Sequence, residues 1–305
     1  MGRGVKVDSN LNVSDERIKG KFIVSNPNYK NSDKRIDLAL EATSVDRLGT
    51  SGYKSNVTGF TIGTQFEYLD DFRLGLSTKN NIEKIDVDGS ASAKQKKQDG
   101  NYFDSFIGLD FIYDKRNQKY QTTDGFFSNY NVNVPIISDT NTLTNIYNYK
   151  IFKELYENNI STLSLLFKTA NSLSSDDVKL SERLYLPGRR LRGFESGKVG
   201  PKDGSDFIGG NYVSSINATT TLPVIFQNVQ NVDVVMFADA ANIWGVDYDS
   251  SLDNSGIRSS VGLGLDWLTP VGPLTFSFAH PITKESTDIE ETFRFNIGTT
   301  FWWIT

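Results

Sequence analysis

Apolar and polar residues alternate with a period of two along almost the whole chain. Near the C-terminus, Val261, Leu263 and Leu265 alternate with Gly262 and Gly264. Successive side chains of a β-strand point to opposite faces, so such a run gives one apolar face and one small or polar face. Clusters of Gly, Asn, Asp or Pro close most of the runs, as turns do. The pattern predicts an all-β chain.

Counting the runs predicts about fourteen strands. Their expected ranges are 3–13, 17–27, 34–46, 56–68, 71–86, 101–114, 124–137, 142–156, 159–173, 207–223, 230–244, 257–269, 273–281 and 291–301.

The alternation also bears on the environment of the sheet. A soluble sandwich buries its apolar face, whereas a membrane barrel turns that face toward lipid and keeps a polar lumen. Barrels also carry aromatic girdles at both interfaces, and aromatic residues stand near the ends of several runs here: Tyr68, Tyr113, Trp244, Trp267, Trp302 and Trp303. We therefore expect a transmembrane antiparallel β-barrel, with a soluble β-protein as the alternative.

Composition excludes several other classes of protein. The chain has no apolar run of about 18 residues, which a membrane helix needs, and its first residues lack the apolar core of a signal peptide. It has no cysteine, a single histidine (His280), a net charge of -5 and a pI of about 5.1. We therefore expect no enzyme activity, no metal, no cofactor and no nucleic-acid partner. His280 is expected at the membrane interface.

Two connections are long. Residues 87–100 contain few apolar residues and are predicted to form a solvated loop, in which the Lys94–Lys97 cluster could meet lipopolysaccharide phosphates. Residues 174–206 differ, because Leu184, Leu186 and Phe194 stand among arginines and glycines. A purely solvated loop would not need these apolar residues, so this loop is predicted to fold back onto the rest of the chain.

An ordered series of motifs carries a family resemblance. LRGF at 191–194 is followed by GGN at 209–211, FADAANIW at 237–244, GLGLDWLTPVGPL at 262–274 and FRFNIG at 293–298. The series resembles the barrel of the BamA family of outer-membrane protein insertases. Residues 17–173 match that family only in strand rhythm and in isolated pieces such as SNPNY at 25–29.

The resemblance implies an architecture. Members of the family have periplasmic POTRA domains followed by a sixteen-stranded barrel, and Gly2-Arg3-Gly4 looks like the turn before the third strand. We expect residues 1–305 to be one barrel domain holding about fourteen of the sixteen strands, with an inward-folded loop at 174–206 and no POTRA domain. The chain is then expected to be truncated at its N-terminus.

The resemblance also implies site residues. In the family the motif Leu191-Arg192-Gly193-Phe194 lies on a loop that dips into the barrel, and Arg192 would pair with Asp239. An enclosed guanidinium needs an anion or other hydrogen-bond acceptors, which supports the pairing on physical grounds. Thr219 stands where the family usually has a second acid, so Arg192 is not expected to pair with two acidic residues. The alternative is a solvated arginine and an aspartate at a strand end.

The C-terminal run resembles the family's targeting strand. Phe293, Phe295, Ile297 and Phe301 alternate along it, and residues 302–305 extend beyond it. The alternative is an edge strand with one lipid-facing side. Gly262-Leu263-Gly264 is no dinucleotide fingerprint, because no helix follows it; its small residues are expected to leave space in the lumen.

The function implied by the resemblance is that of an assembly factor in the bacterial outer membrane. It would fold and insert β-barrel proteins by lateral opening and strand templating. The expected partners are the lipid bilayer, lipopolysaccharide, unfolded outer-membrane proteins and accessory lipoproteins of an assembly complex. Two alternatives are a related barrel that exports a passenger protein and a passive channel.

Overall fold

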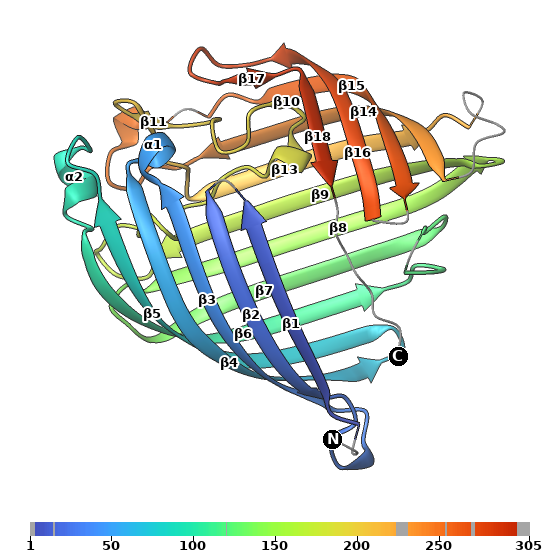
Figure 1. Cartoon of the computed structure of the whole chain (residues 1–305), viewed down its shortest axis with the longest axis horizontal. Helices are drawn as coiled ribbons and strands as arrows, with labels where there is room; N and C mark the ends of the chain where they lie inside the picture. Colours follow the sequence, from blue (N-terminus) through green and yellow to red (C-terminus); the bar gives the residue numbers. More distant parts are fainter. Residues whose placement is uncertain are drawn as a thin grey trace.

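The structure, a computed structural model, describes residues 4–14, 16–119, 121–223, 231–253, 255–269 and 272–297. Within these residues, fourteen strands form one antiparallel sheet in which each strand pairs with the next long strand of the chain (Figure 1). The strands are β1 (Lys6–Ser14), β2 (Arg17–Asn26), β3 (Arg35–Arg47), β4 (Tyr53–Leu69), β5 (Phe72–Val87), β6 (Gly100–Asp114), β7 (Gly125–Ser138), β8 (Thr142–Tyr156), β9 (Asn159–Ser172), β13 (Tyr212–Thr221), β14 (Val232–Trp244), β15 (Arg258–Thr269), β16 (Gly272–Thr283) and β18 (Phe293–Ile297).

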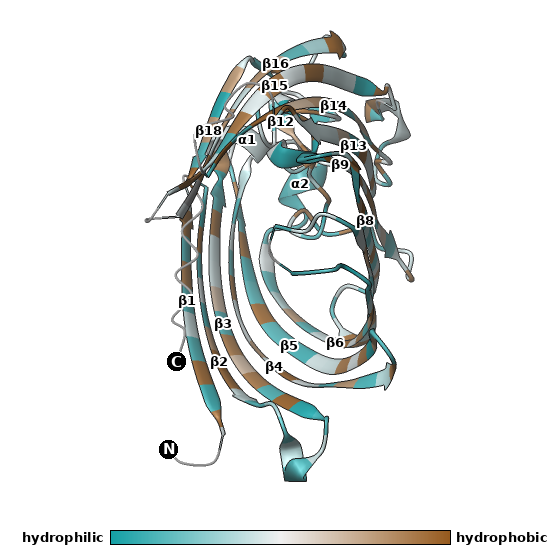
Figure 2. Ribbon diagram, turned by 90° about the vertical axis from the view of Figure 1, so that its right-hand side faces the viewer, coloured by the Kyte–Doolittle hydropathy of each residue, from teal (hydrophilic) through white to brown (hydrophobic). Residues whose placement is uncertain are grey.

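The sheet curls into a barrel wall around a lumen (Figure 2). The predicted all-β barrel and its number of strands are confirmed. Helices are short; the longest in the described ranges are α1 (Leu48–Ser51) and α2 (Ala93–Lys96). Among the residues that the structure describes, no helix has the length and apolar character needed to cross a membrane.

The two faces of the wall separate as the alternation predicts. Leu263 is 52% exposed on the outer face and Met236 is 50% exposed, whereas Ser260 and Asp239 on the same two strands are buried in the lumen. Brown and teal bands alternate along the strands in Figure 2 for the same reason. Large exposed apolar side chains over a whole wall suit contact with lipid rather than with water.

The two ends of the barrel differ in the length of their connections. At one end, β4 joins β5 through residues 70–71 and β8 joins β9 through residues 157–158. At the other end, the connections include 88–99, 173–211 and 245–257. We call these the turn end and the loop end. In outer-membrane barrels the short turns face the periplasm and the long loops face the outside.

Two predicted segments differ from the structure, and a third is only partly described. The strand expected at 207–223 begins only at Tyr212, because Gly209 has a φ of +66° and Gly210 forms an isolated bridge with Leu184 of the long loop. The connection at 87–100 is not fully solvated: Ser92 and Gln95 form a capping box on α2, and Gln95 is buried. In the described range the last strand ends at Ile297, and Phe301 lies outside the described residues.

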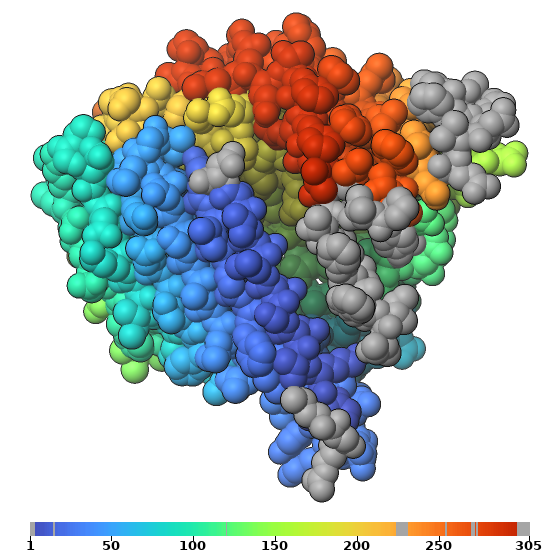
Figure 3. All heavy atoms as spheres, viewed as in Figure 1, coloured from blue at the N-terminus to red at the C-terminus, as the bar shows by residue number. Residues whose placement is uncertain are grey.

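The sheet has two end strands, β1 and β18, and no strand pairing joins them within the described residues. Every residue of β1 is exposed. In Figure 3, atoms of the opposite wall are visible between the blue N-terminal strands and the red C-terminal strands. We call this side of the barrel the seam.

The assignment of faces predicts the cost of a charge on the wall. Leu263→Arg places a guanidinium in the apolar outer face at mid-strand, and we expect it to cost about 2–4 kcal/mol of stability. Asn131→Arg is the matched lumen control, because Asn131 donates to Asp110 in the lumen (Nδ2 to Oδ1 2.8 Å) and an arginine there keeps a carboxylate partner. Denaturant unfolding in lipid vesicles measures both changes. Equal costs at the two positions would contradict the assigned faces.

Candidate functional site

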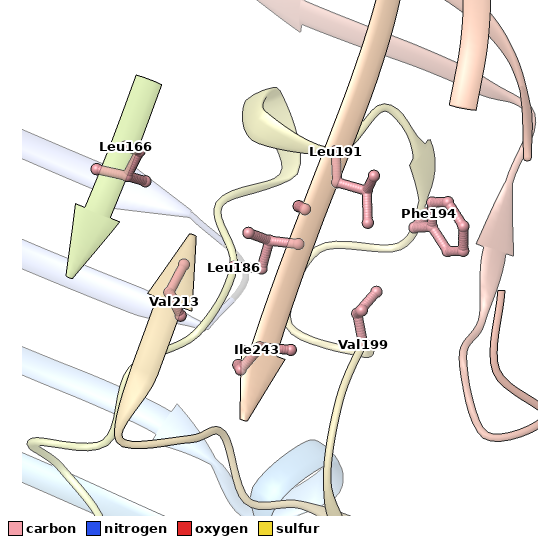
Figure 4. Close-up of a cluster of buried hydrophobic side chains, with 8 residues drawn as sticks. Leu166, Leu186, Leu191, Phe194, Val199, Val213 and Ile243 are labelled. Atoms are coloured by element: carbon pink, nitrogen blue, oxygen red, sulfur yellow. The ribbon is translucent and has the colours of Figure 1, made fainter. Parts of the chain in front are cut away.

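The long connection between β9 and β13, residues 173–211, folds against the inside of the wall. Its short elements are a 3-10 turn, η2 (Gly188–Arg190), and three two-residue strands, β10 (Gly193–Phe194), β11 (Lys202–Asp203) and β12 (Asp206–Phe207). We call residues 173–211 the lumen loop. Leu186, Leu191, Phe194 and Val199 of this loop are buried in one cluster with wall residues Leu166, Val213, Ala241 and Ile243 (Figure 4). Burying each large apolar side chain is worth about 1.5–3 kcal/mol, which explains the apolar residues among the loop's glycines.

Arg192 and Asp239 meet at the tip of this loop. The guanidinium donates twice to the carboxylate, from Nε to Oδ2 at 2.7 Å and from Nη2 to Oδ1 at 2.7 Å. The backbone N–H of Arg192 donates to the same Oδ2 at 3.1 Å. The Asp239 side chain is 0% exposed and that of Arg192 is 17% exposed. A bidentate pair of this kind is the strongest and most directional ion pair available to these side chains.

Neighbouring wall residues complete the surroundings of the pair. The guanidinium carbon of Arg192 lies 3.4 Å from the ring centroid of Phe237, a cation–π contact. A Cβ at Gly262 would come within 2.5 Å of that ring, so the glycine makes room for Phe237. Thr219 accepts only a long contact from Nη2, at 3.4 Å. Asp239 therefore holds both arms of the arginine, and Thr219 adds little.

A row of lumen residues extends the contact across the wall. The strand register places Ser164, Asn217, Asp239 and Ser260 side by side on four neighbouring strands. Asn217 donates from Nδ2 to Asp239 Oδ1 at 2.8 Å and to the carbonyl of Arg190 at 2.9 Å. The Ser260 hydroxyl donates to the carbonyl of Arg192. The row thus provides hydrogen-bond donors for the Asp239 carboxylate and for the backbone carbonyls of the loop tip.

The loop tip also pairs with the connection that leads into the last strand. Gly193 and Phe194 of β10 form a short antiparallel ladder with Glu291 and Glu290 of β17 (Glu290–Glu291). Arg294 of β18 donates from Nη2 to the carbonyl of Phe194 at 2.6 Å and from Nε to Glu291 Oε2 at 2.8 Å. Gly193 has a φ of +93°, a conformation that favours glycine, and a Cβ there would lie 3.2 Å from that of Ala279.

A second ion pair fixes the same connection. Arg258 and Asp288 have fully buried side chains, and Arg258 donates from Nε to Asp288 Oδ2 at 2.9 Å and from Nη2 to Oδ1 at 3.2 Å. Asp288 Oδ1 also accepts the backbone N–H of Gly200 in the lumen loop at 3.2 Å. The loop, the start of β15 and the β16–β18 connection are therefore held as one unit.

On the opposite wall, Lys179 anchors the start of the lumen loop. Its side chain is 1% exposed, and its Nζ lies 2.9 Å from Glu83 of β5, 2.5 Å from Asp104 of β6 and 3.7 Å from Glu182 of the loop. Burial raises the pKa of Glu182 to about 7, against the opposing effect of Lys179. The three carboxylates raise the pKa of Lys179 despite its burial, so the ammonium stays charged.

The structure thus places the sequence-predicted residues in different surroundings. Arg192, Gly193, Phe194 and Asp239 come together at one point, with Leu191 in the apolar cluster beside them. Phe293 and Phe295 lie on β18 with exposed side chains, as does Ile297. His280 is exposed on β16, three residues before the end of that strand. Lys94 is not a purely solvated lysine, because it donates to the carbonyl of Tyr248 at 2.8 Å and to Asp249 Oδ2 at 3.0 Å.

Sequence reasoning missed several residues of this site. Asn217 and Ser260 occupy ordinary lumen positions of alternating strands, and no motif distinguishes them. Phe237 begins the motif FADAANIW, but the motif by itself does not indicate that its ring meets Arg192. Lys179 could have been found, because a lysine among apolar residues of a folded-back loop needs a carboxylate partner. Its partners could not have been found, because Glu83 and Asp104 lie far away in the sequence.

The arrangement can hold the lumen loop in place mechanically. Within the described residues, no group of three or more His, Asp or Glu side chains has a geometry that could hold a metal ion. The contacts instead fasten a loop to β5, β6 and β14 and to the connection before β18.

The Arg192–Asp239 pair predicts non-additive mutational costs. Arg192→Ala and Asp239→Ala should each cost about 3–5 kcal/mol of loop docking, because each leaves the other charge without its partner. The double variant should be little worse than either single variant. Arg192→Lys should rescue poorly, since an ammonium cannot reproduce the planar fork. Limited proteolysis of the lumen loop in a full-length protein measures docking.

Arg189→Ala is the matched control for this experiment. Arg189 precedes the motif on the same loop but makes no hydrogen bond or ion pair with the described residues. Its loss should leave the rate of cleavage unchanged. Additive costs for Arg192→Ala and Asp239→Ala would show that the two residues act separately.

Glu182 predicts that loop docking depends on pH. Its pKa is about 7 in the folded protein, above the ordinary glutamate value of 4.5, so the docked state holds the proton more tightly. This contribution to docking is complete below about pH 4.5 and is lost as the pH rises through about 7. Cleavage of the loop start should therefore be slower at about pH 5.5 than at about pH 8. Glu182→Gln should reduce the difference, with Glu83, Asp104, Lys179 and Tyr102 left as the surrounding ionisable groups. An unchanged difference would rule out Glu182 as its source.

Comparison with known proteins places these features in a family. Residues 1–301 match the Omp85 superfamily domain. The chain is 26% identical over 296 residues to the outer membrane protein assembly factor BamA of Neorickettsia risticii, covering 94% of this chain and 38% of that protein. It is 25% identical over 296 residues to BamA of Nitratidesulfovibrio vulgaris, covering 93% of this chain and 36% of that protein. The chain spans less than two fifths of the length of these relatives.

Solved structures show the same fold. The structure of BamA from Haemophilus ducreyi lacking POTRA domains 1–3 superposes with a TM-score of 0.88 at 21% identity, over 99% of this chain and 65% of that one. CdiB from Acinetobacter baumannii superposes less closely, with a TM-score of 0.54 at 11% identity, over 95% of this chain and 58% of that one. The match to the family domain over nearly the whole chain shows that this protein belongs to the Omp85 superfamily.

Proposed function

We propose that this chain is the barrel of an outer-membrane assembly factor that folds β-barrel proteins and inserts them into the bacterial outer membrane. The observation that carries the proposal is the docking of the lumen loop, because Arg192 and Asp239 fasten it to the wall and β10 joins it to the connection before β18. Within the described residues β18 is an end strand of the sheet. An edge strand presents backbone N–H and C=O groups that an incoming strand can pair with. In hydrocarbon these groups must be paired within protein, so an edge that opens toward the membrane favours strand addition.

The lumen loop gives the seam a defined support. β18 has five residues in the described range, and its approach is held by β10, by Arg294 and by Asp288. Arg192 in turn holds β10 to the wall through Asp239. Loosening the loop tip should therefore free the start of β18 and change how the seam opens.

The similar proteins support this function over the alternatives. Two relatives that cover more than nine tenths of the chain bear the name outer membrane protein assembly factor. The closer of the two structural matches described above is also to a BamA barrel, whereas CdiB superposes less well. The remaining partners of the proposal are lipopolysaccharide at the loop end, unfolded outer-membrane proteins as substrates and the accessory lipoproteins of an assembly complex.

The C-terminal run is proposed to serve as the targeting strand of the chain itself. Phe293, Phe295 and Ile297 present one apolar outer face on β18, and Phe301 continues the alternation in the sequence. Such a face contacts lipid, while the backbone N–H and C=O groups along the edge of the strand are available to another protein.

Reconstitution tests the proposed function. The full-length protein is placed in lipid vesicles with its accessory lipoproteins, and folding of an added unfolded barrel protein is followed by its shift to a heat-modifiable band. We expect faster folding than in empty vesicles. Arg192→Ala should slow it several-fold. Vesicles that instead take up small solutes without faster folding would indicate a passive channel. Transfer of a passenger protein into vesicles would indicate an exporter.

A further inference from the structure

A large cavity in the lumen carries an unusual concentration of positive charge. It has a volume of about 1030 Å³ and lies near the turn end, between the lumen loop and the wall. Six cationic side chains line it and only two acidic ones, Asp233 and Asp266. The cationic residues are Arg116, Lys119, Lys150, Arg189, Arg190 and Arg192. We call this the basic cavity.

Only two of these cations have a carboxylate partner within the described residues. Arg116 pairs with Asp114 and Arg192 with Asp239. Arg190 donates to the amide oxygens of Asn217 and Asn148, at 3.3 and 3.2 Å. Lys150 lies over the ring of Phe152, 4.8 Å from its centroid. Lys119 and Arg189 are exposed and form no ion pair with the described part of the chain.

The charge is a property of this place rather than of the chain. The chain as a whole carries a net charge of -5. A second lumen cavity, of about 460 Å³, is lined by Lys79, Lys168 and three arginines, but also by the acids Glu41, Glu83, Asp104 and Glu182. Cations and acids therefore nearly balance there. In the basic cavity they do not.

A recess lined mainly by one sign of charge, with protein walls around it, focuses its field and concentrates ligands of the opposite sign. The four cations without a carboxylate come from three separate segments: the β6–β7 turn, β8 and the lumen loop. One small oxyanion would engage only part of such a spread set. The rings of Phe127, Phe152 and Phe276 also line the cavity, and its volume is at the upper limit of ordinary small-molecule sites, which reach about 1000 Å³.

We propose that the basic cavity binds an acidic segment of polypeptide that enters from the turn end. Carboxylates of the segment meet Lys119, Lys150 and Arg189, and its apolar side chains lie against the aromatic rings. The source of the segment, an unfolded substrate protein, rests on the proposed function. Binding of the segment does not.

A binding experiment on the full-length protein in nonionic detergent tests this inference. The probe is a short fluorescent peptide in which glutamate alternates with serine, followed by fluorescence anisotropy. The test variant is Lys150→Gln with Arg189→Gln, which removes two unpaired cations and leaves Arg190 and Arg192 in place. The matched control is Arg17→Gln with Lys79→Gln, which removes two cations from the balanced cavity. Protease resistance of the lumen loop checks that each variant is folded.

We expect saturable binding that weakens with salt and is about tenfold weaker in the test variant, which corresponds to about 1.4 kcal/mol. The control variant should bind the glutamate peptide as tightly as the wild type does. A peptide in which lysine alternates with serine should not bind to the wild-type protein. Together these results would assign the binding to the basic cavity. Equal losses in both variants, or no saturable binding, would overturn the inference. Displacement of the peptide by equimolar inorganic phosphate would also overturn it, because the site would then accept a free oxyanion.

The outcome is independent of the insertion assay. Peptide binding without accelerated folding of a barrel protein would contradict the proposed function and leave the basic cavity as an acidic-peptide site. Accelerated folding without peptide binding would support the proposed function and contradict the assignment of the basic cavity as a peptide site.

Discussion

A fully buried carboxylate on the barrel wall organises the rest of this structure. Asp239 faces the lumen, and its side chain has no exposure to solvent. An isolated buried charge is costly, so it must be paired and its remaining acceptor positions filled. Arg192 and Asn217 do this, and because Arg192 lies on the lumen loop, the requirement brings the loop to the wall.

The other contacts of the loop follow from that placement. Once its tip is held at β14, Leu186, Leu191 and Phe194 reach the apolar cluster, and β10 reaches β17. At its other end, Lys179 joins the loop to β5 and β6 across the lumen. The loop therefore connects β5 and β6 to β14, although these strands are several positions apart in the order of the sheet. Since β17 leads into β18, this brace also reaches the seam.

Charge is distributed unevenly inside the same barrel. Near the loop end, cations such as Lys179 and Arg258 have acidic partners and are buried. Near the turn end, Lys150 and Arg189 are exposed to a cavity without such partners. Paired charges hold the loop in position, whereas unpaired charges in a recess remain available to a ligand. The two halves of the lumen therefore suit two roles, one structural and one in binding.

Local pattern by itself determined the class of fold, the faces of the strands and most of their positions. A period of two is a property of neighbouring residues, so Leu263 could be assigned to the outer face and Gly262 to the lumen without knowing what surrounds them. The ordered motifs from residue 191 onward pointed to Arg192 and Asp239, but the order of residues could not supply their geometry. Only the tertiary structure placed Asn217 and Ser260 beside Asp239, put Glu83 and Asp104 around Lys179, and gathered unpaired cations from three segments in one cavity. The physical reason is that strand register and loop path decide which distant side chains share an enclosed space, and charge pairing depends on that distance rather than on position in the sequence.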